Sequence, residues 1–179
     1  MRVITGSARG VPLLTLPGEE MIRPTAQRVK ESMFSAVQFE IEGRRVLDAF
    51  AGSGQLGIEA LSRGAVSCLF LENNRQAVQI LRKNIEKTRL QERSKILQTD
   101  TLAYLRRTGG VFDLILLDPP YGNGMLQAAL ALTAPKLAAG GVILCEAPEH
   151  EAMPDIQGGA ELEREYQYGK TCVYLYRRL

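Results

Sequence analysis

The sequence contains few of the side chains that bind metal ions. Its 179 residues include one histidine and three cysteines. A single histidine, His150, excludes a histidine-rich metal cluster and a histidine-based proton relay. Cys68, Cys145 and Cys172 are far apart and lie in apolar runs, which predicts buried free thiols in a reducing compartment rather than a zinc site or a disulfide. We therefore expect chemistry without a metal.

Long apolar runs are also missing. No uncharged apolar segment reaches the roughly 20 residues that a membrane-spanning helix needs, and Met1 to Gly6 has no signal-peptide core. The net charge of +2 does not by itself indicate a nucleic-acid partner. With 45% hydrophobic and 23% charged residues, the composition is ordinary for one compact domain. We expect a cytoplasmic protein that does not bind membranes.

Five apolar runs alternate with segments long enough for helices. This pattern predicts an α/β fold with a mostly parallel sheet and crossover helices. The predicted parallel strands are Arg45–Phe50, Ser67–Glu72, Lys95–Asp100, Phe112–Asp118 and Gly141–Ala147. Leu162–Tyr168 and Cys172–Arg178 then alternate apolar and polar residues, which predicts a C-terminal antiparallel hairpin. The expected sheet has seven strands.

Residues 1–43 form a separate N-terminal appendage before the main domain, which we expect to occupy residues 44–179. Two short strand-like runs within Arg2–Leu16 predict a small β-hairpin. Thr25 is a candidate cap for a helix that runs to about Phe39. The appendage is too small for a core of its own, so it should pack on the main domain.

The tetrapeptide Asp118-Pro119-Pro120-Tyr121 ends the fourth predicted strand. Neither proline can donate a backbone N–H to a sheet, so the strand must stop and the next carbonyls lie outside the ladder. Ligands bind at this edge of open α/β sheets. A carboxylate, free carbonyls and an aromatic face suit a flat ring with an exocyclic NH2, on which Tyr121 would stack. Taken alone, the tetrapeptide favours a simple strand-terminating turn. The residues upstream of it decide between this turn and a ligand site.

A glycine-rich loop follows the first predicted strand. Gly52, Gly54 and Gly57 match G-x-G-x-x-G, and Glu72 lies twenty residues after Gly52, as in dinucleotide-binding folds. Asp48, at the mouth of the loop, would repel a pyrophosphate. The same carboxylate would attract a cofactor that carries an ammonium and a sulfonium. S-adenosylmethionine carries both.

Acidic residues at the ends of the predicted strands could bind this cofactor. Glu72 would hold its ribose, Asp100 with Thr101 its adenine amino group, and Phe50 would line the pocket. A tight turn and close helix packing explain Gly57 but not these acidic residues together. The predicted cofactor site comprises Asp48, Phe50, Ala51, Gly52, Ser53, Gly54, Glu72, Asn73, Asp100 and Thr101.

These motifs, in this order, resemble the class I S-adenosylmethionine-dependent methyltransferases, whose fold is Rossmann-like. Within them, the chain looks like the group in which [DN]-P-P-[YFW] holds a target amine. Further segments are similar to the RsmD family: Arg2-Val3-Ile4-x-Gly6 with Arg9-Gly10, Arg23-Pro24-Thr25-x-x-Arg28-Val29-Lys30-Glu31-Ser32-x-Phe34, Gly57–Ala65 and Tyr168-Gly169-x-Thr171. The resemblance implies a cytoplasmic enzyme that methylates the 2-amino group of one guanine in bacterial 16S ribosomal RNA, preferably in the assembled small subunit. Its product would be S-adenosylhomocysteine, and we expect a monomer without a metal.

The resemblance also implies roles for individual residues. The catalytic residues would be Asp118, Pro119, Pro120 and Tyr121. Contacts to RNA phosphates are expected from Arg2, Arg9, Arg23, Arg28 and Lys30. A solvated basic face is the alternative for Arg28 and Lys30. Arg23 and Thr25 could instead close over the methionine carboxylate of the cofactor.

Three other functions fit parts of the pattern. An amino-methyltransferase acting on DNA adenine or cytosine, or on a protein glutamine, usually has Asn at position 118, and the DNA enzymes typically carry a recognition domain. A nicotinamide oxidoreductase would use the Gly52–Gly57 loop but would have to tolerate Asp48. A catalytically silent RNA-binding module would not need the acidic residues at the ends of the predicted strands.

Overall fold

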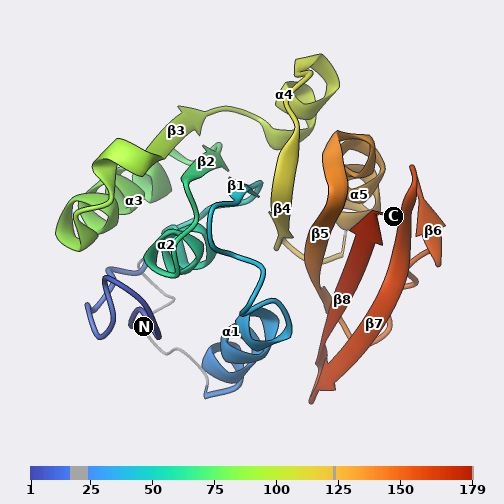
Figure 1. The fold of residues 1–179 in the computed structure, drawn as a ribbon, viewed down its shortest axis with the longest axis horizontal. Helices are drawn as coiled ribbons and strands as arrows, with labels where there is room; N and C mark the ends of the chain where they lie inside the picture. The colour runs from blue at the N-terminus through green and yellow to red at the C-terminus, as the bar shows by residue number, and fades with distance from the viewer. Residues whose placement is uncertain (17–23, 123, 179) are drawn as a thin grey trace.

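The computed structural model describes residues 1–16, 24–122 and 124–178. An eight-stranded sheet with helices on both faces forms the molecule, and its strand order is β3-β2-β1-β4-β5-β8-β7-β6 (Figure 1). The parallel strands are β1 (Arg45–Asp48), β2 (Ser67–Glu72), β3 (Ser94–Gln98), β4 (Phe112–Leu117) and β5 (Leu137–Pro148). The antiparallel strands are β6 (Ile156–Gln157), β7 (Ala160–Tyr168) and β8 (Thr171–Arg178).

The predicted α/β fold, with its parallel strands and its C-terminal hairpin, is confirmed. The sheet gains one strand over the seven predicted, because the two-residue β6 is too short to show a sequence pattern. Three predicted strands extend too far. β1 stops at Asp48 rather than Phe50, β3 at Gln98 rather than Asp100, and β4 at Leu117 rather than Asp118. Asp100 instead caps the next helix.

The helices are α1 (Pro24–Ala36), α2 (Gln55–Ser62), α3 (Arg75–Thr88), α4 (Thr101–Arg107) and α5 (Met125–Thr133), with short 3-10 turns η1 (Gln91–Arg93) and η2 (Ala134–Lys136). The predicted N-terminal boundary of α1 is wrong, because the helix already includes Pro24 and Thr25 therefore lies inside it. Proline suits the first turn of a helix, where its missing N–H costs nothing. The helix also ends at Ala36, before Phe39. No helix among the residues described here is long and apolar enough to cross a bilayer.

The predicted N-terminal β-hairpin is reduced to a single antiparallel bridge between Arg2 and Pro12. The Val3 amide still donates a backbone hydrogen bond of 3.1 Å to the carbonyl of Val11. The strands do not continue because the amide groups of Ile4 and Thr5 bind a side chain of α2 instead of a neighbouring strand.

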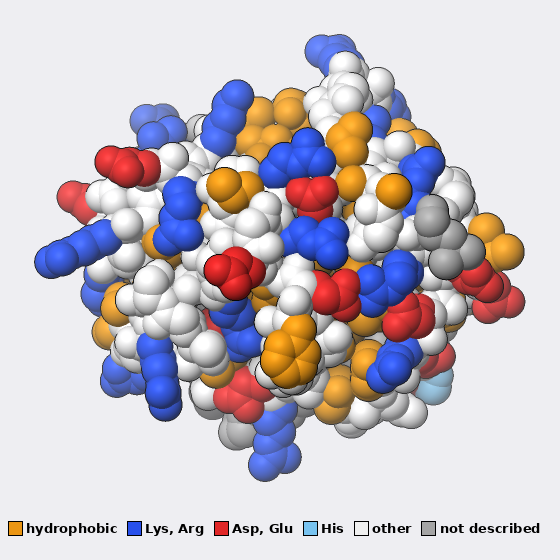
Figure 2. All heavy atoms as spheres, viewed as in Figure 1, with side chains coloured by type: hydrophobic (Ala, Val, Ile, Leu, Met, Phe, Trp, Pro, Cys, Tyr) orange, Lys and Arg blue, Asp and Glu red, His pale blue; other side chains and the backbone are white. Residues whose placement is uncertain are grey.

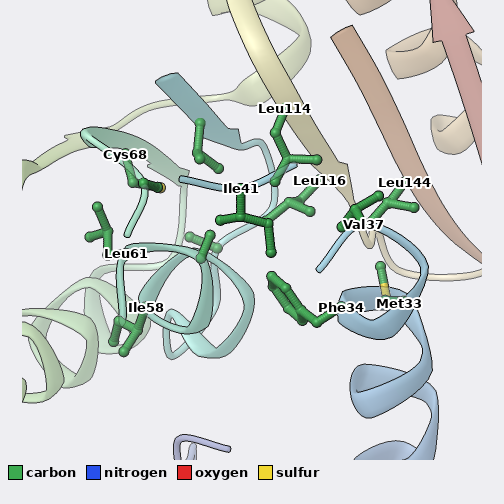
Figure 3. Packing of buried hydrophobic residues seen from close by; sticks show 14 of the residues in the cluster. Met33, Phe34, Val37, Ile41, Ile58, Leu61, Cys68, Leu114, Leu116 and Leu144 are labelled. Atoms are coloured by element: carbon green, nitrogen blue, oxygen red, sulfur yellow. The ribbon is translucent and has the colours of Figure 1, made fainter. Parts of the chain in front are cut away.

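One apolar core lies between the sheet and the helices α1, α2 and α3. In Figure 3, side chains from α1 and the turn after it lie against side chains of β4 and β5, and the α2 side chains lie beside them. The labelled residues are Met33, Phe34, Val37, Ile41, Ile58, Leu61, Cys68, Leu114, Leu116 and Leu144. Val3, Ala8 and Leu13 belong to the same core, so the N-terminal segment packs on this face of the sheet. A second core on the other face includes residues of α4 and α5.

Candidate functional site

The carboxyl ends of the parallel strands meet at one edge of the sheet. The register pairs Asp48 of β1 with Leu116 of β4 and with Phe70 of β2. The glycine-rich loop after β1 therefore lies between the segments that follow β2 and β4. Ligands of open α/β folds bind at such an edge.

Glu72 connects the end of β2 to the glycine-rich loop. The amide of Gly52 donates a hydrogen bond of 2.8 Å to Glu72 Oε2, and the amide of Asn74 donates one of 2.7 Å to Oε1. The Ala51 amide donates to the carbonyl of Leu71 at 2.9 Å. Since an ionised carboxylate has about four acceptor positions, Glu72 can orient the loop and still accept a hydrogen bond from a ligand hydroxyl.

Asp48 lies beneath the glycine-rich loop rather than on its surface. The side chain is 2% exposed, and its Oδ2 accepts a hydrogen bond of 2.9 Å from the amide of Gly57. Burial raises the pKa of Asp48 to about 7, and the charge of Glu72 acts in the same direction. Near neutral pH this carboxyl is therefore only partly ionised, so it repels a pyrophosphate less than the sequence indicated.

The three glycines of the loop have two different roles. A Cβ on Gly54 would lie 2.2 Å from Leu81 Cδ1, and one on Gly57 would lie 2.3 Å from Phe70 Cε1. These two glycines allow the loop and α2 to pack closely. Gly52 has φ +52° and no atom within 4 Å of the position of a Cβ, so its backbone borders open space in which a ligand could approach the main chain.

Asp100 and Thr101 hold the start of α4. Asp100 Oδ1 accepts a hydrogen bond of 2.7 Å from the amide of Ala103, a helix-capping role that the sequence analysis missed. The Thr101 hydroxyl donates to the carbonyl of Ala49 at 2.6 Å and is buried. Thr101 therefore fixes α4 against the glycine-rich loop, and Asp100 is the exposed member of the pair.

The residues Asp118 to Tyr121 follow β4 at the same edge. Pro119 is buried, Asp118 is half-buried, and the Tyr121 side chain is 51% exposed. The Tyr121 hydroxyl donates a hydrogen bond of 3.1 Å to Glu146 Oε1. Burial raises the pKa of Tyr121, and the charges of Glu146 and Asp118 add to this effect, so the phenol stays protonated and acts as a donor.

Glu146 of β5 is a site residue that the sequence analysis did not single out. It lies near the end of the fifth parallel strand, just as the predicted acidic residues lie at the ends of the other four. That shared position was the signal that could have identified it. Burial raises the pKa of Glu146, and its hydrogen bond from Tyr121 opposes this shift.

Comparison with known proteins assigns the chain to a family. A family model described as "Conserved hypothetical protein 95" matches residues 1–177. The chain belongs to this family, the RsmD family.

The match extends to individual members of the RsmD family. YlbH of Bacillus subtilis is 37% identical, over 99% of both chains. The ribosomal RNA small subunit methyltransferase D of Escherichia coli K12 is 32% identical, over 99% of this chain and 90% of the relative. The solved structure of yhhF from Escherichia coli superposes with a TM-score of 0.89 at 30% identity. The match covers 99% of this chain and 97% of the yhhF chain. The fold is accordingly that of the class I methyltransferases.

The remaining predicted cofactor residues of this RsmD-family chain lie around the loop. Ala51 and Ser53 are buried, Asn73 is exposed, and Phe50 is half-buried against the second core. The predicted contact of the Thr25 side chain falls outside the part that the structure describes. Among the described residues, no group of three or more His, Cys, Asp or Glu side chains could hold a metal ion.

The N-terminal basic residues differ in their surroundings. Arg2, Arg9 and Arg28 are exposed, and Arg2 Nη1 donates to the carbonyl of Gly10 at 3.0 Å. Arg23 lies outside the described residues. Figure 2 shows Lys and Arg side chains spread among Asp and Glu over the face in view, rather than gathered in one basic patch.

The structure does not support the predicted phosphate contact of Lys30. Its side chain is 3% exposed, and Nζ lies 3.2 Å from Oε2 of the buried Glu59. Burial lowers the pKa of Lys30, and the charge of Glu59 opposes this shift. Neither an RNA contact nor a solvated basic face fits this placement.

Glu59 of α2 is the centre of the contact between the N-terminal segment and the main domain. Its carboxylate accepts hydrogen bonds from the amides of Ile4 at 2.8 Å and Thr5 at 3.1 Å. Arg63 Nε donates to it at 2.8 Å, and Lys30 pairs with it. The sequence analysis missed this role, since nothing in the local pattern shows that an acidic residue on a helix faces inward. A hollow of about 410 Å³ lies beside this contact, lined in part by Thr5, Arg63 and residues of α1.

Proposed function

We propose that this RsmD-family protein transfers a methyl group from S-adenosylmethionine to the exocyclic 2-amino group of a guanine in 16S ribosomal RNA. The observation that carries the proposal is the position of Asp118-Pro119-Pro120-Tyr121 at the end of β4, beside the glycine-rich loop that Glu72 orients. The name of the Escherichia coli relative supports a ribosomal RNA substrate.

The residues of the loop fit the proposed methyl donor. The open backbone at Gly52 leaves room for a ligand, and Glu72 and Asp100 offer acceptors for the ribose hydroxyls and the adenine amino group. In its ionised form, Asp48 adds negative charge below a site that would receive an ammonium and a sulfonium. When bound, S-adenosylmethionine supplies an electrophilic methyl group.

Asp118 and Pro119 would prepare the target amine. The lone pair of a guanine 2-amino group is delocalised into the ring, which makes the nitrogen a poor nucleophile. Hydrogen bonds from the two N–H groups to the Asp118 carboxylate and the Pro119 carbonyl favour a pyramidal nitrogen, whose lone pair then points toward the methyl donor. Holding both partners in this orientation lowers the barrier. Asp118, or a water molecule next to it, takes the proton that leaves the amine.

Tyr121 would position the base. Half of its side chain is accessible, so the ring offers a face on which a guanine can stack. The target base must first leave its own stack in the RNA, because chemistry on an exocyclic group needs access to the base edge.

The N-terminal appendage would guide the RNA into place. Arg2, Arg9 and Arg28 are exposed and can contact phosphates, together with Arg23. In this proposal residues 1–43 bind RNA and border the cofactor, while residues 44–179 carry the chemistry. We propose that the enzyme works as a cytoplasmic monomer on the assembled small subunit.

The test is to label small subunits that come from a strain without the enzyme. These subunits and naked 16S RNA are incubated with the protein and isotopically labelled S-adenosylmethionine, and mass spectrometry locates the labelled base. We expect N2-methylguanine at one position, with assembled subunits preferred over naked RNA. Label in adenine, in cytosine or in a protein glutamine would overturn the substrate assignment. Tight binding of NAD without binding of S-adenosylhomocysteine in calorimetry would overturn the cofactor assignment.

A further inference from the structure

Glu146 and Asp118 lie next to each other at the edge of the sheet. Leu116 of β4 and Leu144 of β5 pair in register and belong to the same core. The last pair of this register is Leu117 with Cys145, so Asp118 and Glu146 are the next residues along the two neighbouring segments. The charge of Asp118 also acts on Tyr121. The three side chains therefore form one cluster.

Within this cluster Glu146 holds the tyrosine. Glu146 Oε1 lies 3.1 Å from the Tyr121 hydroxyl and accepts its hydrogen bond. The Thr171 side chain of β8 also acts on the phenol and lowers its pKa, so the outer end of the ring lies near both β5 and β8. Asp118 lies at the other end of the tetrapeptide, where the proposed amine would bind. The hydrogen bond from Tyr121 thus goes to Glu146, and it involves the outer end of the ring.

Tyr121 needs such an anchor. The residue follows two prolines on an exposed turn, and half of its side chain faces solvent. A tyrosine in this position can adopt several rotamers, and most of them would place the ring away from the base. The hydrogen bond from the phenol fixes the ring through its far end and leaves its faces accessible.

We propose that Glu146 is a positioning residue that holds the Tyr121 ring in the orientation in which it stacks on the target guanine. This inference rests on the proposed function, because it assigns Glu146 a task in the same site. Glu146 acts through Tyr121 rather than on the base itself. Burial raises the pKa of the phenol, so Tyr121 is the donor of this hydrogen bond.

A double-mutant cycle tests this assignment. Glu146→Ala, Tyr121→Phe and the double variant are compared with the unmodified protein in steady-state methylation of small subunits. The lost hydrogen bond involves a charged acceptor, so each single variant should lose on the order of 10-fold to 100-fold in kcat/KM for the subunit. The double variant should lose no more than either single one. The KM for S-adenosylmethionine should not change.

Three comparisons make the result specific. Glu146→Gln keeps a carbonyl oxygen as acceptor and should restore most of the activity lost in Glu146→Ala. Glu161→Ala, on the exposed side of β7, is the matched control and should behave like the unmodified protein. Each variant is first checked for folding by thermal unfolding and for binding of S-adenosylhomocysteine by calorimetry. Should Glu146→Ala fail to fold, Tyr121→Phe removes the same hydrogen bond from the other side and must show the same loss.

Additive losses in the cycle would overturn the inference, because they mean that Glu146 contacts the base independently of Tyr121. Unchanged kcat/KM in Tyr121→Phe would overturn it as well. These outcomes differ from failure of the proposed function, in which the unmodified protein itself would place no methyl group on guanine.

Discussion

The side chain of Asn84 donates a hydrogen bond of 2.8 Å from Nδ2 to the backbone carbonyl of Ser53. Asn84 lies on α3 and is fully buried. The same carboxamide binds the backbone of Leu14, accepting from its amide at 2.8 Å and donating to its carbonyl at 2.9 Å. One buried residue thus joins the N-terminal segment to the glycine-rich loop.

Asn84→Leu should weaken both the fold and the loop. The substitution leaves the buried carbonyl of Ser53 without its partner, and an unsatisfied buried group costs about 1–3 kcal/mol. It also removes two part-buried hydrogen bonds to the backbone of Leu14. We expect a lower free energy of unfolding in urea and weaker binding of S-adenosylhomocysteine in calorimetry. Gln79→Leu, on the exposed side of the same helix, is the control. Unchanged affinity in a destabilised Asn84→Leu would mean that the loop does not depend on this contact.

Asp118→Ala should abolish turnover while the cofactor still binds. The variant removes an acceptor for the target amine, and we expect a loss of kcat of about 10²-fold or more, as for other groups that handle a proton in a transition state. Calorimetry should still detect binding of S-adenosylhomocysteine. Asp155→Ala is an exposed control away from the site. Methylation at the unmodified rate in Asp118→Ala would remove this residue from the mechanism.

Asp48 makes cofactor binding dependent on pH. Its pKa in the folded protein is raised to about 7, so the carboxyl loses its negative charge below this pH and attracts a bound cation less. The affinity for S-adenosylhomocysteine, which carries an ammonium, should therefore fall as the pH drops below 7, by up to about tenfold per pH unit. Calorimetry at pH 6, 7 and 8 measures this dependence. Asp48→Asn should bind with a nearly flat pH profile.

The stability contribution of Asp48 has the opposite dependence on pH. Because its pKa is higher in the folded protein than in the unfolded chain, the folded state holds the proton more tightly. This contribution is fully present below the ordinary pKa of an aspartate and is lost as the pH rises through 7. A pH series of urea unfolding should show a decline in this range that Asp48→Asn does not share.

Arg28 and Lys30 should respond differently to salt. Arg28 is exposed, and if it contacts a phosphate, Arg28→Ala should reduce the slope of log affinity against log salt by about 0.7–0.9. Lys30→Met should leave the slope unchanged, because the ammonium is buried against Glu59. Filter binding of subunits at several salt concentrations measures both. A reduced slope for Lys30→Met would show that this lysine leaves its partner when RNA binds.

The sequence predicted the parallel sheet well. Long runs of branched apolar side chains between helical segments can adopt few structures other than buried strands. The acidic strand ends were also recognisable, since Glu72 and Asp118 directly follow such runs. What the sequence could not show were contacts between distant residues. The amides of Ile4 and Thr5 bind Glu59 rather than a neighbouring strand, and this pairing across more than fifty positions prevented the predicted hairpin.

Burial of polar groups was the other source of error. Lys30 belongs to a basic stretch that looked solvent-exposed, yet the acid that pairs with it lies on another helix. Glu146 was counted as part of an apolar strand, and only the register of β4 and β5 brings it next to Asp118. Local patterns describe each element, whereas the site arises from how the elements are placed together.

The position of β8 affects the order in which parts of the protein can fold during synthesis on the ribosome. This strand inserts between β5 and β7, both of which are synthesised before it. Until residues as far as Arg178 have left the exit tunnel, β5 is paired with β4 on one side only. Thr171 is then not yet beside the phenol of Tyr121. The nascent chain can complete its glycine-rich loop early, whereas the surroundings of Tyr121 are complete only after β8 has been added.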